Sequence, residues 1–161
     1  MSVTIRPMQP EEARRFLEIH RAAVRGIAAK DYSPVVVDAW APLPITDETL
    51  ERFLSNRDHE IRLMAEIDGQ CVGIGAIVVG NSELRACYVA PGAARRGVGS
   101  ALVAEIERIA REHGLLYLRL ESSLTAEPFY EALGYRVEER GEHVLGSGVA
   151  MAAIKMRKQL A

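Results

Sequence analysis

Hydrophobic residues recur along this chain with two different periods, one typical of helices and the other of strands. From Pro10 to Ile27 they lie three and four residues apart, which predicts an amphipathic helix of about 18 residues. The same spacing between residues 97 and 113 predicts a second long helix, which buries Val98, Leu102, Ile106 and Ile109. Shorter apolar runs bounded by Gly, Pro, Asn or Asp predict strands.

Three shorter helices are predicted from residues that can cap a helix N-terminus. A Ser or Thr hydroxyl accepts a hydrogen bond from an amide of the first turn, and such a residue stands at Ser33, Thr46 and Thr125. Proline follows in the first turn at Pro34 and Pro128, where it is tolerated. In the helix after Thr46 we expect three apolar side chains to face the core: Leu50, Phe53 and Leu54.

The strands are predicted over residues 3–7, 60–67, 70–79, 83–90, 115–121, 135–140 and 149–157. The Asp68-Gly69 pair between the second and third strands is the strongest short hairpin signal in the chain. Helices separate the first strand from the second and flank the fifth. This order predicts one domain over residues 1–161, of the α/β or α+β class, with helices on both faces of a mixed sheet.

Composition narrows the class of protein. Hydrophobic residues make up 48% and charged residues 26% of the chain, as in ordinary soluble domains, and the formal net charge of −2 offers no basic surface for nucleic acid. No apolar run reaches the roughly 18 residues of a membrane span, and the first residues lack the apolar part of a signal peptide. Cys71 and Cys87 stand apart without metal-ligand spacing, so we expect reduced, buried thiols, no metal site and a cytoplasmic location.

The segment from residue 90 to residue 102 carries the clearest functional signal. A strand ends at Pro91, a loop of small residues follows, and a helix begins with Gly97 and Gly99 in its first turn. A helix N-terminus has amides without internal partners and a partial positive charge, and glycines let a ligand approach them. Arg95 and Arg96 add positive charge at the same end. The segment therefore predicts an anion site, most naturally for a phosphate or pyrophosphate.

Two common phosphate motifs do not fit the chain. A Walker loop requires a Lys after its last Gly, and no Lys follows Gly97 or Gly99. The segment Gly73-Ile74-Gly75 resembles the start of a dinucleotide-binding fingerprint, but it lies inside an apolar run with no helix after it. We interpret it as a strand that contains glycines.

Two segments in the right order resemble the GCN5-related N-acetyltransferase (GNAT) family. Residues 94–99 are similar to its acetyl-CoA motif, (Gln or Arg)-x-x-Gly-x-(Gly or Ala), with Ala94 at the first position and a matching Gly97-Val98-Gly99. Residues 126–135 are similar to its Ala-x-x-Phe-Tyr-x-x-(Leu or Phe)-Gly-(Phe or Tyr) block, with Ser123 in place of the usual upstream Asn. His20, residues 31–34 and Ala39-Trp40 resemble the N-terminal part of a small bacterial YafP-like subgroup.

The resemblance implies a mostly antiparallel, twisted sheet of six to seven strands flanked by helices, with acetyl-CoA as co-substrate. Its pyrophosphate would bind the amides from Arg96 to Ser100, with Arg95 and Arg96 as support. Its pantetheine arm would follow the splayed end of the preceding strand, where a backbone N–H near Tyr88 or Val89 could stabilise the oxyanion. The cofactor-binding residues implied in this way are Cys87, Tyr88, Val89, Arg95, Arg96, Gly97, Val98, Gly99, Ser100, Ser123 and Phe129.

The resemblance also implies two catalytic residues. Tyr130 holds the position of the family's general acid, and a phenol with a pKa near 10 can protonate a departing thiolate. Its structural alternative is packing in the buried face of a short helix, and the two roles are compatible. Glu83, four residues before Cys87, holds the position of the base in histone-acetylating members. The alternatives are a solvated glutamate at a strand end or an ion pair with Arg85.

Three residues near the N-terminus are candidates for binding the acceptor, because the first helix borders the acceptor cleft in the family: His20, Tyr32 and Trp40. Each has a structural alternative, as a core histidine or as an aromatic ring packed under a loop. Cys87 is not expected to be a nucleophile, since no base is placed near it by spacing. We expect His59 and His143 in surface turns.

The sequence therefore predicts an N-acetyltransferase that moves the acetyl group of acetyl-CoA to a primary amine of a small molecule or protein by direct attack. The alternative is a non-catalytic acyl-CoA-binding or sensor domain of the same fold, for which Ala94 and Ser123 leave room. The expected partner is a small-molecule amine, without nucleic acid or membrane. A homodimer is a common assembly among proteins of this kind.

Overall fold

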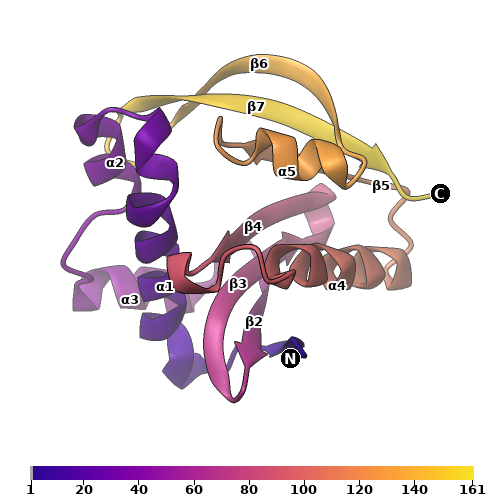
Figure 1. Ribbon diagram of the computed structural model, residues 1–161, viewed down its shortest axis with the longest axis horizontal. Coiled ribbons are helices and arrows are strands. Elements are labelled where there is room, and N and C mark those ends of the chain that lie inside the picture. The colour runs from indigo at the N-terminus through magenta and orange to yellow at the C-terminus, as the bar shows by residue number, and fades with distance from the viewer. Residues whose placement is uncertain (1) are drawn as a thin grey trace.

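The computed structural model describes residues 2–161, which form a seven-stranded sheet with helices on both faces (Figure 1). The strands are β1 (Thr4–Pro7), β2 (Ile61–Ile67), β3 (Gln70–Val78), β4 (Glu83–Val89), β5 (Tyr117–Ser122), β6 (Arg136–Val144) and β7 (Ala150–Gln159). Their order across the sheet is β1-β2-β3-β4-β5-β7-β6. All neighbours are antiparallel except β4 and β5. The expected mostly antiparallel, mixed sheet is confirmed.

The helices also follow the expected order. They are α1 (Ala13–Gly26), α2 (Pro34–Trp40), α3 (Asp47–Ser55), α4 (Val98–Glu112) and α5 (Glu127–Ala132). Single 3-10 turns lie at Pro10–Glu12, Ala28–Asp31, Val79–Asn81 and Pro91–Ala93. Among residues 2–161, no helix is both long enough and apolar enough to cross a membrane.

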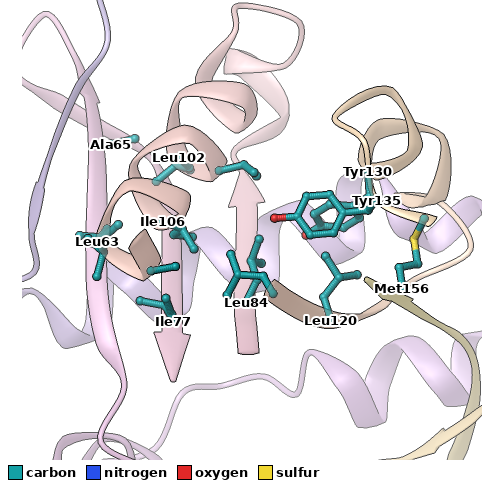
Figure 2. Close-up of a cluster of buried hydrophobic side chains, with 14 of the residues drawn as sticks. Leu63, Ala65, Ile77, Leu84, Leu102, Ile106, Leu120, Tyr130, Tyr135 and Met156 are labelled. Carbon is teal, nitrogen blue, oxygen red and sulfur yellow. The ribbon is translucent and has the colours of Figure 1, made fainter. Parts of the chain in front are cut away.

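The long helices α1 and α4 lie on opposite faces of the sheet, as alternating side chains of β2 show. Leu63 and Ala65 belong to a core cluster with residues of α4, whereas Met64 between them packs with residues of α1. Figure 2 shows the α4 side of this core, where Tyr130 and Tyr135 complete the apolar layer beside Leu120. In Figure 1, β6 and β7 extend as a long pair above α5.

The two glycines of β3 allow α4 to pack closely on the sheet. A Cβ at Gly73 would lie 2.8 Å from Val98 Cγ1, and one at Gly75 would lie 3.2 Å from Ile106 Cδ1. Both residues pair with β2 and β4 inside the sheet. This confirms that the Gly-x-Gly at 73–75 is part of a strand, and it explains the glycines by helix–sheet packing.

β4 and β5 separate immediately after they meet. They share a single paired position, Glu83 with Arg119, although β4 pairs with β3 over nearly its whole length. Cys87, Tyr88 and Val89 therefore have a sheet neighbour only in β3. The predicted splayed strand end is present, and it leaves one edge of β4 open to a ligand.

Three local expectations are wrong. Leu54 is 46% exposed, since α3 turns Leu50 and Phe53 rather than Leu54 toward the core. Thr125 does not cap α5; its hydroxyl donates to Asp31 Oδ2 (2.6 Å), while the Ser123 hydroxyl accepts from the Ala126 amide (3.1 Å). His143 lies within β6 rather than in a turn, because this strand continues past residue 140. The thiols Cys71 and Cys87 are free but only partly buried.

Candidate active site

The loop before α4 is shaped as an anion cradle. Arg95 and Gly97 both have positive φ, of 63° and 79°, and Gly97 is the N-cap of the 15-residue helix α4. When residues with positive and negative φ follow each other in a loop, successive backbone amides can turn toward one point. Such an arrangement suits a negatively charged ligand. No acidic residue occupies the first turn of α4. The anion site expected from the sequence therefore has a matching backbone geometry.

The two cradle glycines are required for different reasons. At Gly97 a Cβ would meet nothing within 4 Å, but the left-handed backbone conformation itself favours glycine. At Gly99 the backbone is ordinary, but a Cβ would lie 3.0 Å from the Phe129 ring. Gly99 therefore holds Phe129 of α5 against α4, which joins the two segments that resemble the family.

A cavity of about 500 Å³ extends from this cradle, and we call it the cradle cavity. It lies between the end of α1, the open edge of β4, the start of α4 and Phe129. Its lining includes ten of the eleven residues expected to bind acetyl-CoA: Cys87, Tyr88, Val89, Arg95, Gly97, Val98, Gly99, Ser100, Ser123 and Phe129. The eleventh, Arg96, is exposed beside the cradle and is not among the lining residues.

A second cavity, of about 570 Å³, lies beside β5, and we call it the strand cavity. Its charged lining residues come from three strands: Glu83, Arg85, Arg119, Glu121 and His143. Leu145, Met151 and Ala153 supply an apolar wall. Trp40, Tyr88 and Ser123 line both cavities, so the two meet at these three residues.

Tyr130 is buried behind this junction. Its ring contacts those of Phe129 and Tyr135, with centroids 5.1 and 5.8 Å away, and only 6% of the residue is exposed. Burial raises its pKa well above 10, and Cys87 and Tyr88 of β4 add to this effect. Tyr130 lies outside the lining of both cavities, in the apolar layer seen in Figure 2. Its hydroxyl therefore carries its proton at any pH near neutrality.

Glu83 is held by arginines. Arg85 donates to both carboxylate oxygens, at 2.9 and 3.1 Å, and Arg119 Nη2 lies 3.8 Å away. Burial acts to raise the pKa of Glu83, but these hydrogen bonds and charges outweigh it and lower the pKa overall. The expected ion pair with Arg85 is confirmed. A carboxylate stabilised in this way is a weak proton acceptor, and a role for Glu83 as base stays a prediction.

Of the three acceptor-binding candidates, only Trp40 lines a cavity. His20 packs edge-on against Tyr88, with ring centroids 4.6 Å apart, and burial lowers its pKa to about 3. The Tyr32 hydroxyl donates to the Ala152 carbonyl (2.7 Å) and accepts from the Leu124 amide (2.8 Å). His20 thus packs against Tyr88 of the junction, and Tyr32 is hydrogen-bonded to Leu124, the residue after Ser123.

Cys87 has the properties of a packing residue. Its thiol lies 3.7 Å from the Gly99 carbonyl, and burial raises its pKa to about 12. A nucleophilic cysteine requires a thiolate near neutral pH. The structure therefore supports the expectation that Cys87 is no nucleophile. Within residues 2–161, no group of three or more His, Cys, Asp or Glu is placed to hold a metal ion.

The sequence reasoning missed two residues of the strand cavity, Glu121 and His143. Nδ1 of His143 lies 3.2 Å from Glu121 Oε2, which joins β6 to β5 on the cavity wall. The signal in the sequence was weak. To find the pair, the predicted strand had to be extended from residue 140 to Val144, and His143 had to be recognised as pointing toward β5.

Comparison with known proteins agrees with this geometry. The family model described as "Acetyltransferase (GNAT) domain" matches residues 28–160. The chain is 31% identical over 146 residues to an uncharacterized N-acetyltransferase of Escherichia coli (strain K12), YafP, covering 87% of this chain and 89% of the relative. It is 27% identical to a spermidine N(1)-acetyltransferase of Thermoplasma acidophilum, covering 86% of this chain and 91% of the relative.

A solved structure is also closely similar. The crystal structure of a GCN5-related N-acetyltransferase from Rhodopseudomonas palustris superposes with a TM-score of 0.89 and 28% sequence identity, covering 99% of this chain and 96% of that one. The family model and the E. coli relative each match most of the chain, and the residues that the family model matches include both signature segments. This chain therefore belongs to the GNAT family and is an acyl-CoA-dependent acetyltransferase.

Proposed function

We propose that the protein transfers the acetyl group of acetyl-CoA to a primary amine of a small molecule or protein. The observation that carries this proposal is the meeting of two cavities at Trp40, Tyr88 and Ser123. One cavity ends in an anion cradle, and the other has charged groups of both signs that can receive a polar acceptor. The reaction requires such a pair of sites, because the amine attacks the thioester directly.

We expect the donor to lie in the cradle cavity with its pyrophosphate at the cradle and its thioester at the junction. The pyrophosphate would rest on the amides at the start of α4, with Arg95 and Arg96 nearby. The pantetheine arm would run along the open edge of β4 and add hydrogen bonds where β5 has moved away. This brings the thioester to Tyr88 at the junction, where a backbone N–H of Tyr88 or Val89 can stabilise the oxyanion.

Tyr130 is our candidate for the acid that protonates the departing thiolate. It is buried next to the open edge of β4, and its raised pKa keeps the proton in place until the thiolate forms. In this proposal Tyr130 has both of the roles that the sequence left open: it packs in the apolar layer, and it donates the proton.

The test is to incubate the protein with acetyl-CoA and a panel of amines, and to measure the release of free CoA thiol. The panel contains spermidine, an aminoglycoside, free lysine and a peptide with a free N-terminus. We expect acetyl-CoA to raise the Tm and at least one amine to accelerate thiol release above the acceptor-free rate. A raised Tm without accelerated release would support the alternative, a non-catalytic acyl-CoA-binding domain. An unchanged Tm would contradict the placement of the donor itself.

A further inference from the structure

The charged wall of the strand cavity contains two carboxylates in very different surroundings. Glu83 is engaged by two arginines, whereas Glu121 contacts the imidazole of His143. The side chain of Glu83 is 16% exposed, while those of Glu121 and His143 are 38% and 49% exposed. A group that removes a proton from a substrate must reach both the substrate and the solvent that finally takes the proton. Glu121 and His143 have this access.

We propose that His143, oriented by Glu121, takes the proton from the acceptor's ammonium group in the strand cavity. This inference rests on the proposed function above. Nδ1 of His143 lies 3.2 Å from Glu121 Oε2, so in the proposed tautomer the Nδ1 proton faces this carboxylate and Nε2 is left to accept the proton. Glu121 acts here as a positioning residue, since it fixes the tautomer and the orientation of the ring.

The strand geometry directs the pair toward the junction. In β5 the buried side chains are Leu118, Leu120 and Ser122, so Arg119 and Glu121 lie on the opposite face, toward the cavity. Ser123, at the junction of the two cavities, follows two residues after Glu121. An amine beside His143 is therefore in the cavity that shares Tyr88 and Ser123 with the proposed thioester position.

Other charged groups around the pair are engaged elsewhere. Lys155 of β7 lies opposite Glu121 in the strand register, but its ammonium group contacts Glu139 (3.4 Å). From β4, Arg85 contacts Glu83, Asp58 and Glu60, and Arg119 of β5 donates to the Asn81 carbonyl. His143 is the one histidine among the described residues that line the strand cavity.

Every proton that moves in the proposed reaction has a donor and an acceptor among His143, Tyr130, the substrates and solvent. One proton of the ammonium passes to Nε2 of His143 and then to solvent, which leaves a neutral amine. The amine nitrogen forms a bond to the thioester carbon and loses a second proton to solvent, while the carbon–sulfur bond breaks. The thiolate takes a proton from Tyr130, which solvent replaces. The products are the acetylated amine, free CoA thiol and one proton released overall.

The kinetic test compares His143→Gln, Glu121→Gln and Glu83→Gln with the original protein, using the amine of the panel that the original protein acetylates fastest. For His143→Gln we expect kcat/KM for the amine to fall about 100-fold near neutral pH and the loss to shrink as pH rises, because the amine then deprotonates unaided. Glu121→Gln should lose about 10-fold, and KM for acetyl-CoA should stay unchanged in both variants. His113→Gln, an exposed histidine at the far end of α4, is the matched control and should behave as the original protein.

An equal loss at every pH, or no loss, for His143→Gln would overturn the proposal. So would a pH-dependent loss confined to Glu83→Gln, which would make Glu83 the base. A ligand-free measurement separates this proposal from the proposed function. The ring ¹⁵N shifts of His143 should report the Nδ1–H tautomer, and Glu121→Gln should abolish that preference. If the original protein acetylates no amine, the proposed function fails, whatever the tautomer.

Discussion

At Gly97, backbone conformation rather than space excludes a side chain. Its φ of 79° lies in the left-handed region, where an L-residue costs about 1–2 kcal/mol, and its neighbourhood is open. Gly97→Ala should therefore lower the free energy of unfolding by about 1–2 kcal/mol and weaken acetyl-CoA binding as the cradle relaxes. Urea unfolding and calorimetric titration would measure the two effects. Gly92→Ala, in open space without a positive φ, should change neither. Equal effects in both variants would contradict this explanation.

Tyr130 permits a second prediction at the same scale. Tyr130→Phe keeps the ring contacts with Phe129 and Tyr135 and removes only the hydroxyl. We expect kcat to fall about 100-fold, because the thiolate then leaves without a proton donor. Acetyl-CoA affinity should change little, since the proposed proton transfer takes place only after the donor has bound and its carbon–sulfur bond breaks. Steady-state kinetics at saturating acetyl-CoA would show this, and an unchanged kcat would remove Tyr130 from the mechanism.

At the scale of elements, the segment between β5 and α5 is held in place by a distant residue. Tyr32, just before α2, accepts a hydrogen bond from Leu124 and donates one to Ala152 of β7. This hydroxyl therefore ties α2, the end of β5 and β7 together beside the junction. Neither the spacing nor the composition of the chain could reveal a contact between residues 92 positions apart.

Removing this hydroxyl should loosen the segment. Tyr32→Phe removes one hydrogen bond from each of two backbone groups, the Leu124 amide and the Ala152 carbonyl, and we expect a loss of about 1 kcal/mol in unfolding free energy. Hydrogen exchange should accelerate over residues 122–126 in particular. Tyr117→Phe on β5, whose ring stacks under Arg157, is the control and should leave this exchange unchanged. Uniform acceleration throughout the chain would mean that the tie is not local.

The predicted elements show where reasoning from the sequence succeeds. The hairpin at Asp68-Gly69 and the helix starts at Ser33 and Thr46 follow from local chemistry, and the structure has all three. The predicted cap of α5 was wrong because the Thr125 hydroxyl donates to Asp31, a tertiary contact that the sequence does not reveal, and the N-cap of α5 is Ala126, without a side-chain cap. The length of β6 was underestimated because its residues are exposed, so no hydrophobic alternation marks them.

At the scale of the whole molecule, burial of His20 couples stability to pH. Arg21 Nη1 lies 3.0 Å from His20 Nδ1, and burial, aided by the Arg21 charge, lowers the pKa of His20 from 6.5 to about 3. As pH falls below 6.5, the unfolded chain gains a proton at this residue while the folded chain does not. The contribution of neutral His20 to the free energy of unfolding is therefore fully present above pH 6.5 and is lost progressively as pH falls toward 3.

His20→Gln should flatten this dependence just below pH 6.5. The free energy of unfolding would be measured in urea above pH 4.5, because below that pH the protonation of Glu12 also changes the stability. A hydrogen bond from Arg6 lowers the pKa of Glu12 to about 2, so its contribution is lost only as pH falls from 4.5 toward 2. His113→Gln is the control, as an exposed histidine. If the free energy of unfolding of His20→Gln depends on pH as steeply as that of the original protein, the buried imidazole is not the cause of this dependence.

The proposed donor half of the site could be predicted from the sequence, because it depends on backbone conformation and on small residues close together in the chain. The acceptor half combines residues from β4, β5, β6 and α2, and its arrangement depends on strand order and on where β4 leaves β5. This is why Glu121 and His143 emerged only from the structure.

The junction at Trp40, Tyr88 and Ser123 also has a consequence for inhibitor design. The two cavities share Trp40, Tyr88 and Ser123 in their walls, so a ligand in one cavity would lie close to a ligand in the other. An acceptor amine joined to the sulfur of CoA through a short linker would extend past these residues and place one half in each cavity. Its second half would then bind at the high effective concentration set by the linker, and its affinity would exceed that of either half alone.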